Sequence, residues 1–325
     1  MSRTVSVPWG MWYGPRELEL DWPAGWRVDV CGMADAPPLA DEAIRARLAE
    51  PLECPSLGEL AAGRESCCVL VDDLTRPTPA GRVLPAILEE LQEAGLPPEQ
   101  VTIIVANGAH GHLTRQALEK KLGPKACDRC VVMRHDTHQN LTSIGQVAGV
   151  GEVLVSRFFH EADLKLAVTG VMPHFMCGFS GGAKIVMPGA CGIETIAATH
   201  EHTVAGPPAR VGVIEGNPMR RVIEQCAVRA GLEFCVCCGF NSGGQLSSLS
   251  CGKPGAAHRV AVEAARRTCA TEVVRGADVA VFNAFPKDTE FIQAMAALNV
   301  WAERRDADRA LARPGGTIVV ITACS

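Results

Sequence analysis

The feature that most constrains the fold of this chain is the alternation of short apolar strands with amphipathic helices. The runs CCVLV, VTIIVA and KLAVTGV predict strands that end at Val71, Ala106 and Val171, and a fourth predicted strand ends at Arg134. Strands that are apolar throughout are typical of parallel sheets that are buried on both faces. A helix predicted over 81–95 shows the helical apolar period. This β-α-β order predicts a doubly wound α/β sheet with right-handed crossovers.

The length of 325 residues predicts two domains. We place an N-terminal α/β domain at 1–205 and a second α/β domain at 206–325. Each is expected to hold a mainly parallel sheet flanked by helices, with the active site in the cleft between them. The segment 1–30 predicts an added β-hairpin. A parallel strand normally has a covering helix, so the apolar ending TIVVITACS suggests that the second domain is incomplete at its C-terminus.

Polar loops follow the four predicted strands of the first domain. They read DDLTRPTP, NGAHGHLT, HDTH and PHFMCGFSGGAK. In open α/β sheets, ligands bind beyond the carboxyl ends of the strands. We therefore expect the four loops to form a single site.

The loop GFSGGAK is similar to a phosphate-binding loop but departs from the nucleotide pattern. Ala183 replaces the second glycine and Ile185 follows the lysine, which excludes the nucleoside-triphosphatase motif. Small residues at a helix start still let backbone N–H groups approach a single phosphate or carboxylate. In such a pocket Lys184 is expected to have a lowered pKa and to act as a nucleophile.

Histidines and an acidic–basic loop supply the other candidate groups. Imidazole is the commonest neutral ligand of nickel, zinc or iron. The Asp72–Asp73 pair suits Mg²⁺, and the guanidinium of Arg76 suits a carboxylate or a phosphate. The histidines in or beside the polar loops are His110, His112, His135, His138, His174, His200 and His202.

Composition excludes several classes of function. The net charge of −5 disfavours a broad nucleic-acid surface, and no apolar run approaches the ~20 residues that a membrane span needs. The N-terminus lacks the apolar core of a secretory signal, so we expect a cytoplasmic protein without nucleic-acid or membrane partners. The 15 cysteines are an odd number, and we interpret most of them as small buried residues.

Together the quoted loops, with the stretch PG…ETIAATH that follows them, resemble the nickel-dependent lactate racemase family from about Asp72 to His202. The resemblance implies a nickel-pincer nucleotide, a pyridinium mononucleotide that holds nickel through two sulfurs and a ring carbon. It implies that Lys184 is the covalent tether, that His200 is the protein's nickel ligand, and that His110 and His174 are the catalytic acid and base. The implied cofactor-binding residues are Lys184, Asp73, Thr75, Arg76, Ser180, Gly181 and Gly182.

The implied reaction is racemisation or epimerisation of a 2-hydroxy acid by proton-coupled hydride transfer. One histidine takes the hydroxyl proton while a hydride leaves Cα, and the second histidine serves the mirror-image substrate. Arg76 and Gln293 are the implied substrate contacts. The family has a lysine three residues after that glutamine, where this chain has Ala296. Either Lys287 or Arg76 is expected to compensate for that lysine, or the substrate is a larger hydroxy acid or a sugar acid instead of lactate.

Other functions stay open at this point. A nicotinamide dehydrogenase is disfavoured because no GxGxxG follows a strand. A carrier protein that stores the pincer cofactor without turnover would keep Lys184 and His200. A zinc-dependent hydrolase would use His110, His112 and Asp72. The enzymes that make the pincer cofactor are expected to act upstream of this protein.

Overall fold

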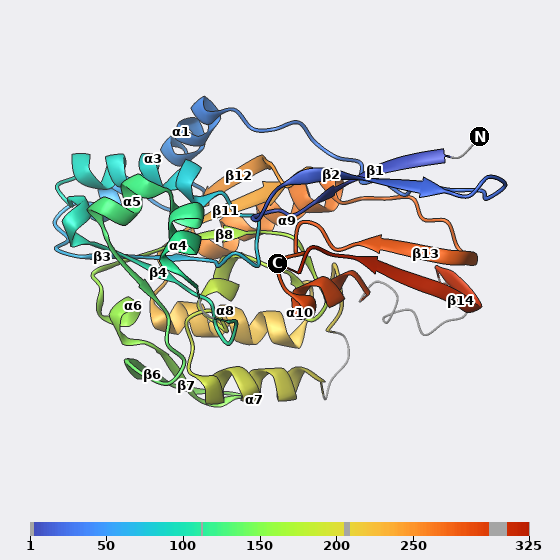
Figure 1. Cartoon of the computed structure of the whole chain (residues 1–325). Helices are drawn as coiled ribbons and strands as arrows, with labels where there is room; N and C mark the ends of the chain where they lie inside the picture. The colour runs from blue at the N-terminus through green and yellow to red at the C-terminus, as the bar shows by residue number, and fades with distance from the viewer. Residues whose placement is uncertain (1–2, 112, 205–208, 299–310, 325) are drawn as a thin grey trace.

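The computed structural model describes residues 3–111, 113–204, 209–298 and 311–324. Its centre is a six-stranded sheet in the order β12-β11-β8-β3-β4-β5, flanked by helices (Figure 1). The strands from β3 to β5, with β8 and β11, are parallel, and β12 pairs antiparallel with β11. The sheet strands are β3 (Cys67–Val71), β4 (Val101–Val105), β5 (Val131–Arg134), β8 (Leu164–Gly170), β11 (Phe234–Phe240) and β12 (Leu246–Gly252).

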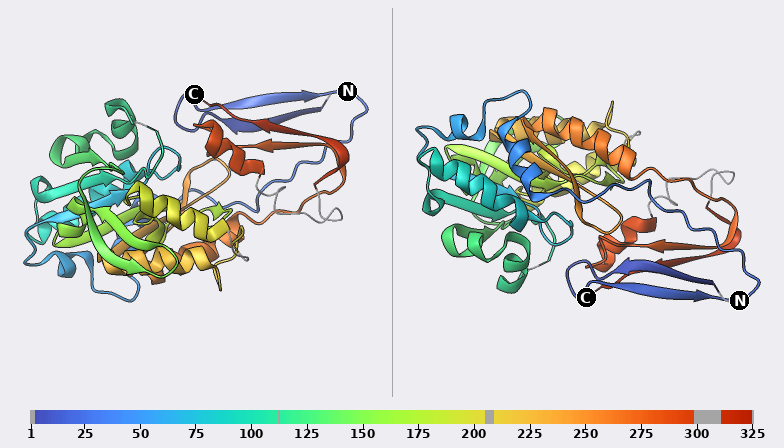
Figure 2. Two further views of the ribbon diagram at one scale, coloured as in Figure 1. Left: turned by 90° about the horizontal axis from the view of Figure 1, so that it is seen from below. Right: turned by 90° about the horizontal axis from the view of Figure 1, so that it is seen from above.

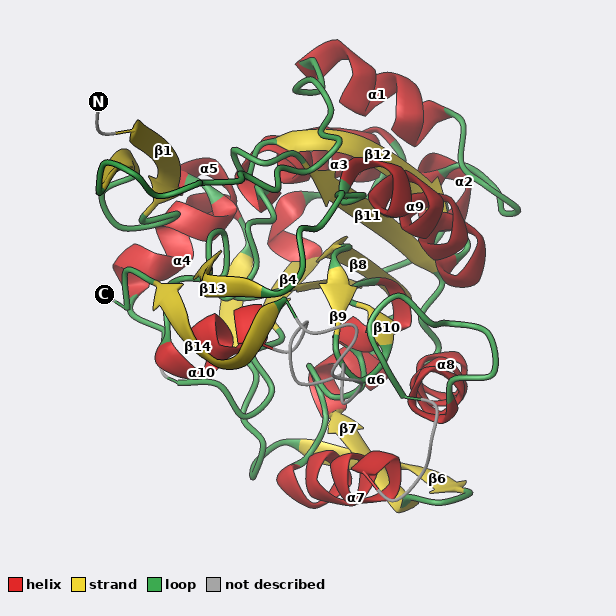
Figure 3. Ribbon diagram, turned by 90° about the vertical axis from the view of Figure 1, so that its right-hand side faces the viewer, coloured by secondary structure: helices red, strands yellow, loops and turns green. Residues whose placement is uncertain are grey.

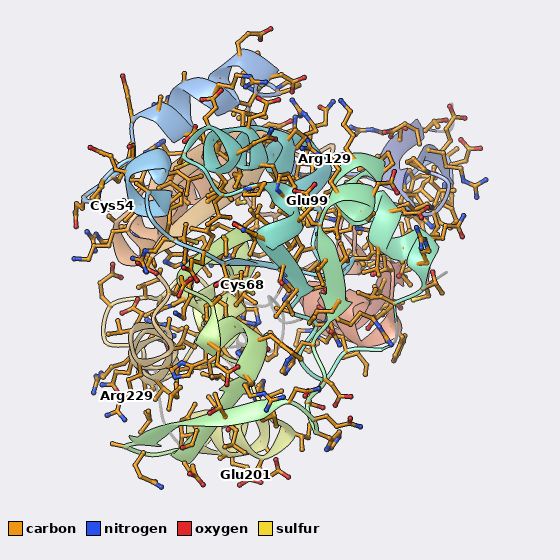
Figure 4. All side chains as sticks on the ribbon, turned by 90° about the vertical axis from the view of Figure 1, so that its left-hand side faces the viewer. Cys54, Cys68, Glu99, Arg129, Glu201 and Arg229 are labelled. Carbon is orange, nitrogen blue, oxygen red and sulfur yellow. The ribbon has the colours of Figure 1, made fainter. Side chains whose placement is uncertain are left out.

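The predicted β-α-β order of this sheet is confirmed. Strands β3 and β11 are buried at every position, as expected for apolar strands with covered faces. Of the residues labelled in Figure 4, Cys68 of β3 is fully buried, whereas Glu99 and Arg129 are exposed. The helices in the described residues are α1 (Asp41–Ala49), α2 (Leu57–Ala61), α3 (Ala80–Glu93), α4 (Arg115–Leu122), α5 (Pro124–Arg129), α6 (Arg157–Glu161), α7 (Ile193–Val204), α8 (Pro218–Ala230), α9 (Pro254–Thr268) and α10 (Phe291–Ala294), with 3-10 turns η1 (Pro98–Gln100), η2 (Gly182–Ile185) and η3 (Met295–Leu298).

The strand order reverses between β3 and β8. From β3 the chain runs outward through β4 and β5, then returns to place β8 on the other side of β3. Loops at such a switch point diverge, which opens a crevice at the carboxyl ends of the two strands. The loops that begin at Asp72 and Val171 therefore face this crevice.

The predicted domain division at residue 205 does not match the limits of the sheet. Strand β11 pairs with β8 from Phe234↔Leu166 to Cys238↔Gly170, so the main sheet takes strands from both sides of residue 205. Helix α9 covers β11 and β12. The boundary was misplaced because a β-α-β period marks crossovers but does not say which sheet the next strand joins.

A second group of strands lies beside the main sheet. Strands β13 (Ala277–Asn283) and β14 (Ala312–Ile321) form a parallel pair, and β1 (Arg3–Trp9) and β2 (Arg16–Trp22) form the expected N-terminal hairpin. Figure 2 shows these four strands and α10 set apart from the six-stranded sheet. The Asn283 side chain donates to the carbonyl of Pro8 at 2.8 Å, which ties the hairpin to β13.

Two small hairpins complete the fold. Strands β9 (Pro173–His174) and β10 (Gly178–Phe179) lie close to the end of β8 (Figure 3). Strands β6 (Leu141–Val147) and β7 (Gly151–Ser156) form an antiparallel pair on which α7 packs. No helix among the described residues is long and apolar enough to cross a membrane.

Candidate active site at the carboxyl ends of the parallel strands

A buried ion pair fixes the loop that follows β3. The Lys121 ammonium lies 2.6 Å from Asp72 and donates to the carbonyls of Asp73 at 2.8 Å and Arg76 at 3.0 Å. Lys121 is 1% exposed, and the second Asp72 oxygen accepts from the Thr78 hydroxyl and the Gly170 amide, both at 2.7 Å. Asp72 is thereby a structural anchor between β3 and β8, and its oxygens are engaged by protein donors.

We expect Lys121→Met to destabilise the protein by about 3–5 kcal/mol, because it leaves the Asp72 carboxylate buried without its cation. Urea unfolding followed by circular dichroism measures this as a lower midpoint at an unchanged slope. Lys125→Met is the matched control, since it removes the same charge from an exposed position on α5. Equal midpoints for the two variants would contradict the anchoring role.

A closed ring of polar contacts joins three distant segments of the chain. His110 Nδ1 lies 2.7 Å from Asp73 Oδ2, and His110 Nε2 lies 3.3 Å from the Gln293 amide nitrogen. Gln293 Oε1 accepts from Arg76 at 3.1 Å. Arg76 also donates to the Thr75 hydroxyl at 3.0 Å, and that hydroxyl donates back to Asp73. The contacts made by Gln293 bring α10 onto the loops that follow β3 and β4.

The polar contacts around His110 determine which of its nitrogens carries the proton. A carboxylate only accepts, so the His110 proton lies on Nδ1 and Nε2 is left as an acceptor for the Gln293 amide. Burial alone would raise the pKa of Asp73, but the hydrogen bonds from His110 and the Thr75 hydroxyl, with the charge of Arg76, lower the pKa below its usual value. Asp73 is therefore ionised and holds His110 as a base, which is the arrangement of a catalytic Asp–His pair.

In His174 the opposite ring nitrogen carries the proton. Its Nδ1 accepts from the backbone N–H groups of Met176 at 3.2 Å and Cys177 at 3.4 Å, so the ring proton lies on Nε2. Its ring stacks on Phe175 with centroids 4.9 Å apart. Burial, followed by the positive charges of Lys184, Lys287 and Arg76, lowers the pKa of His174 well below the usual value. His174 is thus a neutral imidazole that presents an N–H donor.

The loop after β10 is fixed by bonds within the protein. The Ser180 hydroxyl donates to the carbonyl of Gly170 at 2.7 Å, and the Ser180 carbonyl lies 2.9 Å from His258 Nε2. Gly181 and Gly182 have φ of 78° and 59°. A Cβ on Gly182 would lie 2.8 Å from the His258 ring, and one on Gly181 would lie 2.5 Å from Val171. Ser180, Gly181 and Gly182 thus have structural roles in shaping the turn that carries Lys184.

Lys184 lies in a strongly positive environment. Burial lowers the pKa of its amine to about 8, and the cations Arg76 and Arg220 act in the same direction. Arg220 is 2% exposed and donates to the carbonyls of Phe179 and, at 3.4 Å, Gly181. The positive charge of Arg220 beneath the loop favours the neutral, nucleophilic form of Lys184.

The pKa of about 8 makes a prediction for the reactivity of Lys184. Acetylation by a low dose of acetic anhydride should rise with pH with a midpoint near 8, since only the unprotonated amine reacts. An ordinary lysine has its midpoint near 10.4, as free Nα-acetyl-lysine in the same tube will show. Peptide mass spectrometry gives the modified fraction at each pH. A profile for Lys184 that superimposes on the free amine would contradict the perturbed pKa.

The remaining histidines are placed differently. His200 lies on α7, half-buried, and its Nδ1 bonds to the Ile196 carbonyl at 2.7 Å, which leaves the Nε2 lone pair free to bind a metal. His135 is buried, with Nε2 2.8 Å from the Cys191 carbonyl, and His138 is exposed. His112 and the side chain of His202 lie outside the described residues.

The zinc-hydrolase alternative gains no support from this arrangement. Asp72 is bound to Lys121, Thr78 and Gly170 rather than directed at a histidine. Within the described parts of the chain, which omit His112, no three metal-ligating side chains gather.

Four residues of the site region were missed as functional or anchoring groups. Lys121, Arg220 and His258 lie on helices whose amphipathic patterns do not reveal that a polar residue is buried. Cys177 lies in the loop between β9 and β10, and its sulfur contacts the Phe179 carbonyl at 3.2 Å. In the sequence, only Arg220 could have been noticed, because it lies in the first turn after the Asn217-Pro218 helix start.

Comparison with known proteins assigns the family. The family profile described as "Lactate racemase N-terminal domain" matches residues 13–212. The chain belongs to this family. The resemblance to lactate racemases that the loop motifs suggested is therefore confirmed.

Two curated relatives and two solved structures are similar to the chain. Lactate racemase from Thermoanaerobacterium thermosaccharolyticum is 28% identical over 290 residues, which are 88% of this chain and 66% of the relative. Lactate racemase from Lactiplantibacillus plantarum is 27% identical over 285 residues, 86% of this chain and 65% of the relative. The chain thus spans just under two thirds of the length of each.

The structure of the lactate racemase apoprotein from T. thermosaccharolyticum superimposes with a TM-score of 0.81 at 26% identity, covering 99% of this chain and 75% of that one. A crystal structure of a protein from Thermotoga maritima has a TM-score of 0.67 at 22% identity, covering 87% of this chain and 71% of that one, and supports the fold alone. The α/β fold with a mainly parallel central sheet flanked by helices is confirmed.

Proposed function

We propose that this protein is a racemase or epimerase of a 2-hydroxy acid. The observation that carries the proposal is the pair of oppositely set imidazoles. His110 offers a free base at Nε2, held by the Asp73 carboxylate, and His174 offers an N–H donor. The racemase names of the two curated relatives support the same reaction class.

The two histidines act on the hydroxyl group of the substrate. The hydroxyl proton of one enantiomer passes to His110 Nε2 once the substrate displaces the amide of Gln293. His174 Nε2–H donates a hydrogen bond to the oxygen of the other enantiomer, and the proton that His110 took returns to that oxygen when the hydride comes back to Cα. Both rings lie in a site whose cations suit a carboxylate. Two imidazoles are needed because the hydroxyl of the two enantiomers points to different sides when Cα and the carboxylate are held in place.

We propose a nickel-pincer nucleotide as the cofactor, with Lys184 as its covalent tether. The residues fit such a group. A half-buried amine with a pKa of about 8 can be acylated, and the buried Arg220 cation suits an anionic group nearby. His200, with Nε2 free, is the proposed nickel ligand. When bound, this cofactor supplies an acceptor for hydride from Cα, and the protein provides position, charge and proton transfer.

The remaining parts of the proposal follow from the same chemistry. Asp73, Thr75 and Arg76 are proposed cofactor contacts, with Arg76 and Gln293 also reaching the substrate. Cofactor-making enzymes are proposed to act before this protein, and a cytoplasmic location is proposed from the sequence. The ionised Asp73 beside His110 favours an enzyme over a carrier protein, because storage of a cofactor does not require an oriented base.

The test is to co-express the chain with enzymes that make the cofactor. We expect an added mass at Lys184, about one nickel per chain, and interconversion of the enantiomers of at least one 2-hydroxy acid. Polarimetry on a panel of acids detects the turnover, and NMR in D₂O should find little deuterium at Cα. A protein that carries the adduct and nickel yet racemises none of the panel would instead support the carrier alternative.

A further inference from the structure

Lys287 lies in a loop that is fixed on several sides. The loop follows β13, where the Lys287 amide donates to the carbonyl of Ala284 at 2.9 Å. The next residue, Asp288, accepts from the backbone N–H of Gly10 at 2.7 Å, and its carbonyl accepts from the Cys324 amide at 2.8 Å. These bonds join the loop to the N-terminal hairpin and to the end of β14, so the position of Lys287 is held by the fold.

The ammonium group of Lys287 has no partner. Lys287 is only 9% exposed, yet across residues 3–111, 113–204, 209–298 and 311–324 its Nζ forms no hydrogen bond or ion pair. The hydroxyl of Thr289, two residues further along, is also buried without a partner. Buried polar groups are normally satisfied, and an isolated buried charge is costly. The Thr289 hydroxyl is fully buried and the Lys287 residue is 9% exposed, so two unpaired groups on one fixed loop indicate a place where a ligand completes the bonding.

The surroundings of Lys287 require that ligand to be an anion. Beyond the effect of burial, the charges of Arg76 and Lys184 lower the pKa of Lys287, so the three cations lie within electrostatic range of one another. Of the two carboxylates in the site, Asp72 is engaged by Lys121 and Asp73 by His110. An anionic ligand would favour the charged form of Lys287, and neither of these two carboxylates is left to do so.

We propose that Lys287 binds the carboxylate of the 2-hydroxy acid and so determines specificity for acids over their neutral analogues. This inference rests on the proposed function. The carboxylate is favoured over an anionic part of the cofactor because of where the loop leads. It continues directly into α10, whose Gln293 contacts both His110 and Arg76. Lys287 is thus carried by the loop that leads to the residues around His110, whereas Arg220 and His258 bond to the loop of Lys184.

The test uses a pair of probes that cannot react. 2-Hydroxyisobutyrate has the hydroxyl and the carboxylate but no hydrogen on Cα, and 2-hydroxyisobutyramide replaces the charge with a neutral amide. Calorimetry on the cofactor-loaded protein and on the unloaded protein compares wild type, Lys287→Met and the control Lys125→Met. We expect Lys287→Met to weaken binding of the acid about thirtyfold or more while binding of the amide stays unchanged. On the same holoenzyme, KM for the acid substrate should rise far more than kcat falls.

Each outcome decides the proposal. Equal affinity of wild type and Lys287→Met for the acid overturns it, as does a wild type that does not prefer the acid to the amide. Loss of the adduct mass in Lys287→Met would assign the lysine to the cofactor instead. A wild type without adduct or turnover would overturn the proposed function, yet the calorimetry on unloaded protein would still show whether Lys287 selects the carboxylate.

Discussion

Lys184→Ala is expected to carry no covalent cofactor and to show no racemisation above background, while its unfolding midpoint stays close to that of the wild type. The amine is the only part of Lys184 that can form an acyl bond, and its pKa of about 8 keeps a sizeable unprotonated fraction at neutral pH. Removing a half-buried cation from a site that already holds Arg76 and Arg220 relieves repulsion, so no loss of stability is expected. Intact-protein mass and nickel content, measured after co-expression with the cofactor-making enzymes, give the result.

Lys184→Arg is the matched control for this experiment. It keeps the positive charge and most of the side-chain length but cannot be acylated under these conditions. We expect it to lack the adduct as Lys184→Ala does, which separates the covalent role from an electrostatic one. Adduct, nickel and activity that persist in Lys184→Ala would exclude the tether.

His110→Ala and His174→Ala should each lower kcat by about 10²–10⁴-fold and keep the cofactor. The reason is that each removes one proton-handling group but leaves Lys184 and His200 in place. For His110 the loss includes the base that Asp73 orients, and for His174 it includes the donor fixed by the Met176 and Cys177 amides. Initial rates from each enantiomer, with intact mass as the loading measurement, test both variants.

An asymmetry between the two enantiomers is expected before equilibrium is reached. The imidazoles of His110 and His174 carry their protons on opposite nitrogens. The two single variants should therefore differ in partial reactions such as substrate binding. The equilibrium constant between the two enantiomers stays at one in both variants. Asp73→Asn is the control, since it keeps the shape but removes the charge that fixes His110. Full activity in either histidine variant, with normal loading, would exclude that residue from proton transfer.

Much of the fold and the site could be predicted from the chain because the signals are local. The runs at 67–71 and 101–105 are apolar apart from Thr102, which is typical of buried parallel strands, and the structure buries every position except the half-buried Thr102. Thr114 caps α4 through the Ala117 amide, and Asn217 caps α8 through the Arg220 amide, and both residue types favour helix starts. The polar loops after the strands fell at one edge of the sheet because parallel strands share a carboxyl end.

Other features depended on contacts between distant residues. Strand β12 was missed because its sequence LSSLSCG has no clear alternation of apolar and polar residues. The strand is positioned by its antiparallel pairing with β11. The β6–β7 hairpin was missed for the same reason, since its strands are partly polar and are stabilised by packing against α7 and α8. The domain boundary at residue 205 does not match the sheet because β11 pairs with β8, and local sequence patterns do not determine which strands pair.

The sequence by itself determined the chemistry available to this protein: the amine of Lys184, the imidazoles of His110, His174 and His200, and a parallel sheet that presents them at one edge. Only the tertiary structure decided how each group is set. Asp73 fixes the base form of His110, two backbone amides fix the donor form of His174, and Lys287 is buried without a counter-ion. The reason is physical: a residue type fixes which protonation states exist, whereas burial and neighbouring charges, supplied by segments up to some two hundred residues away, select among them.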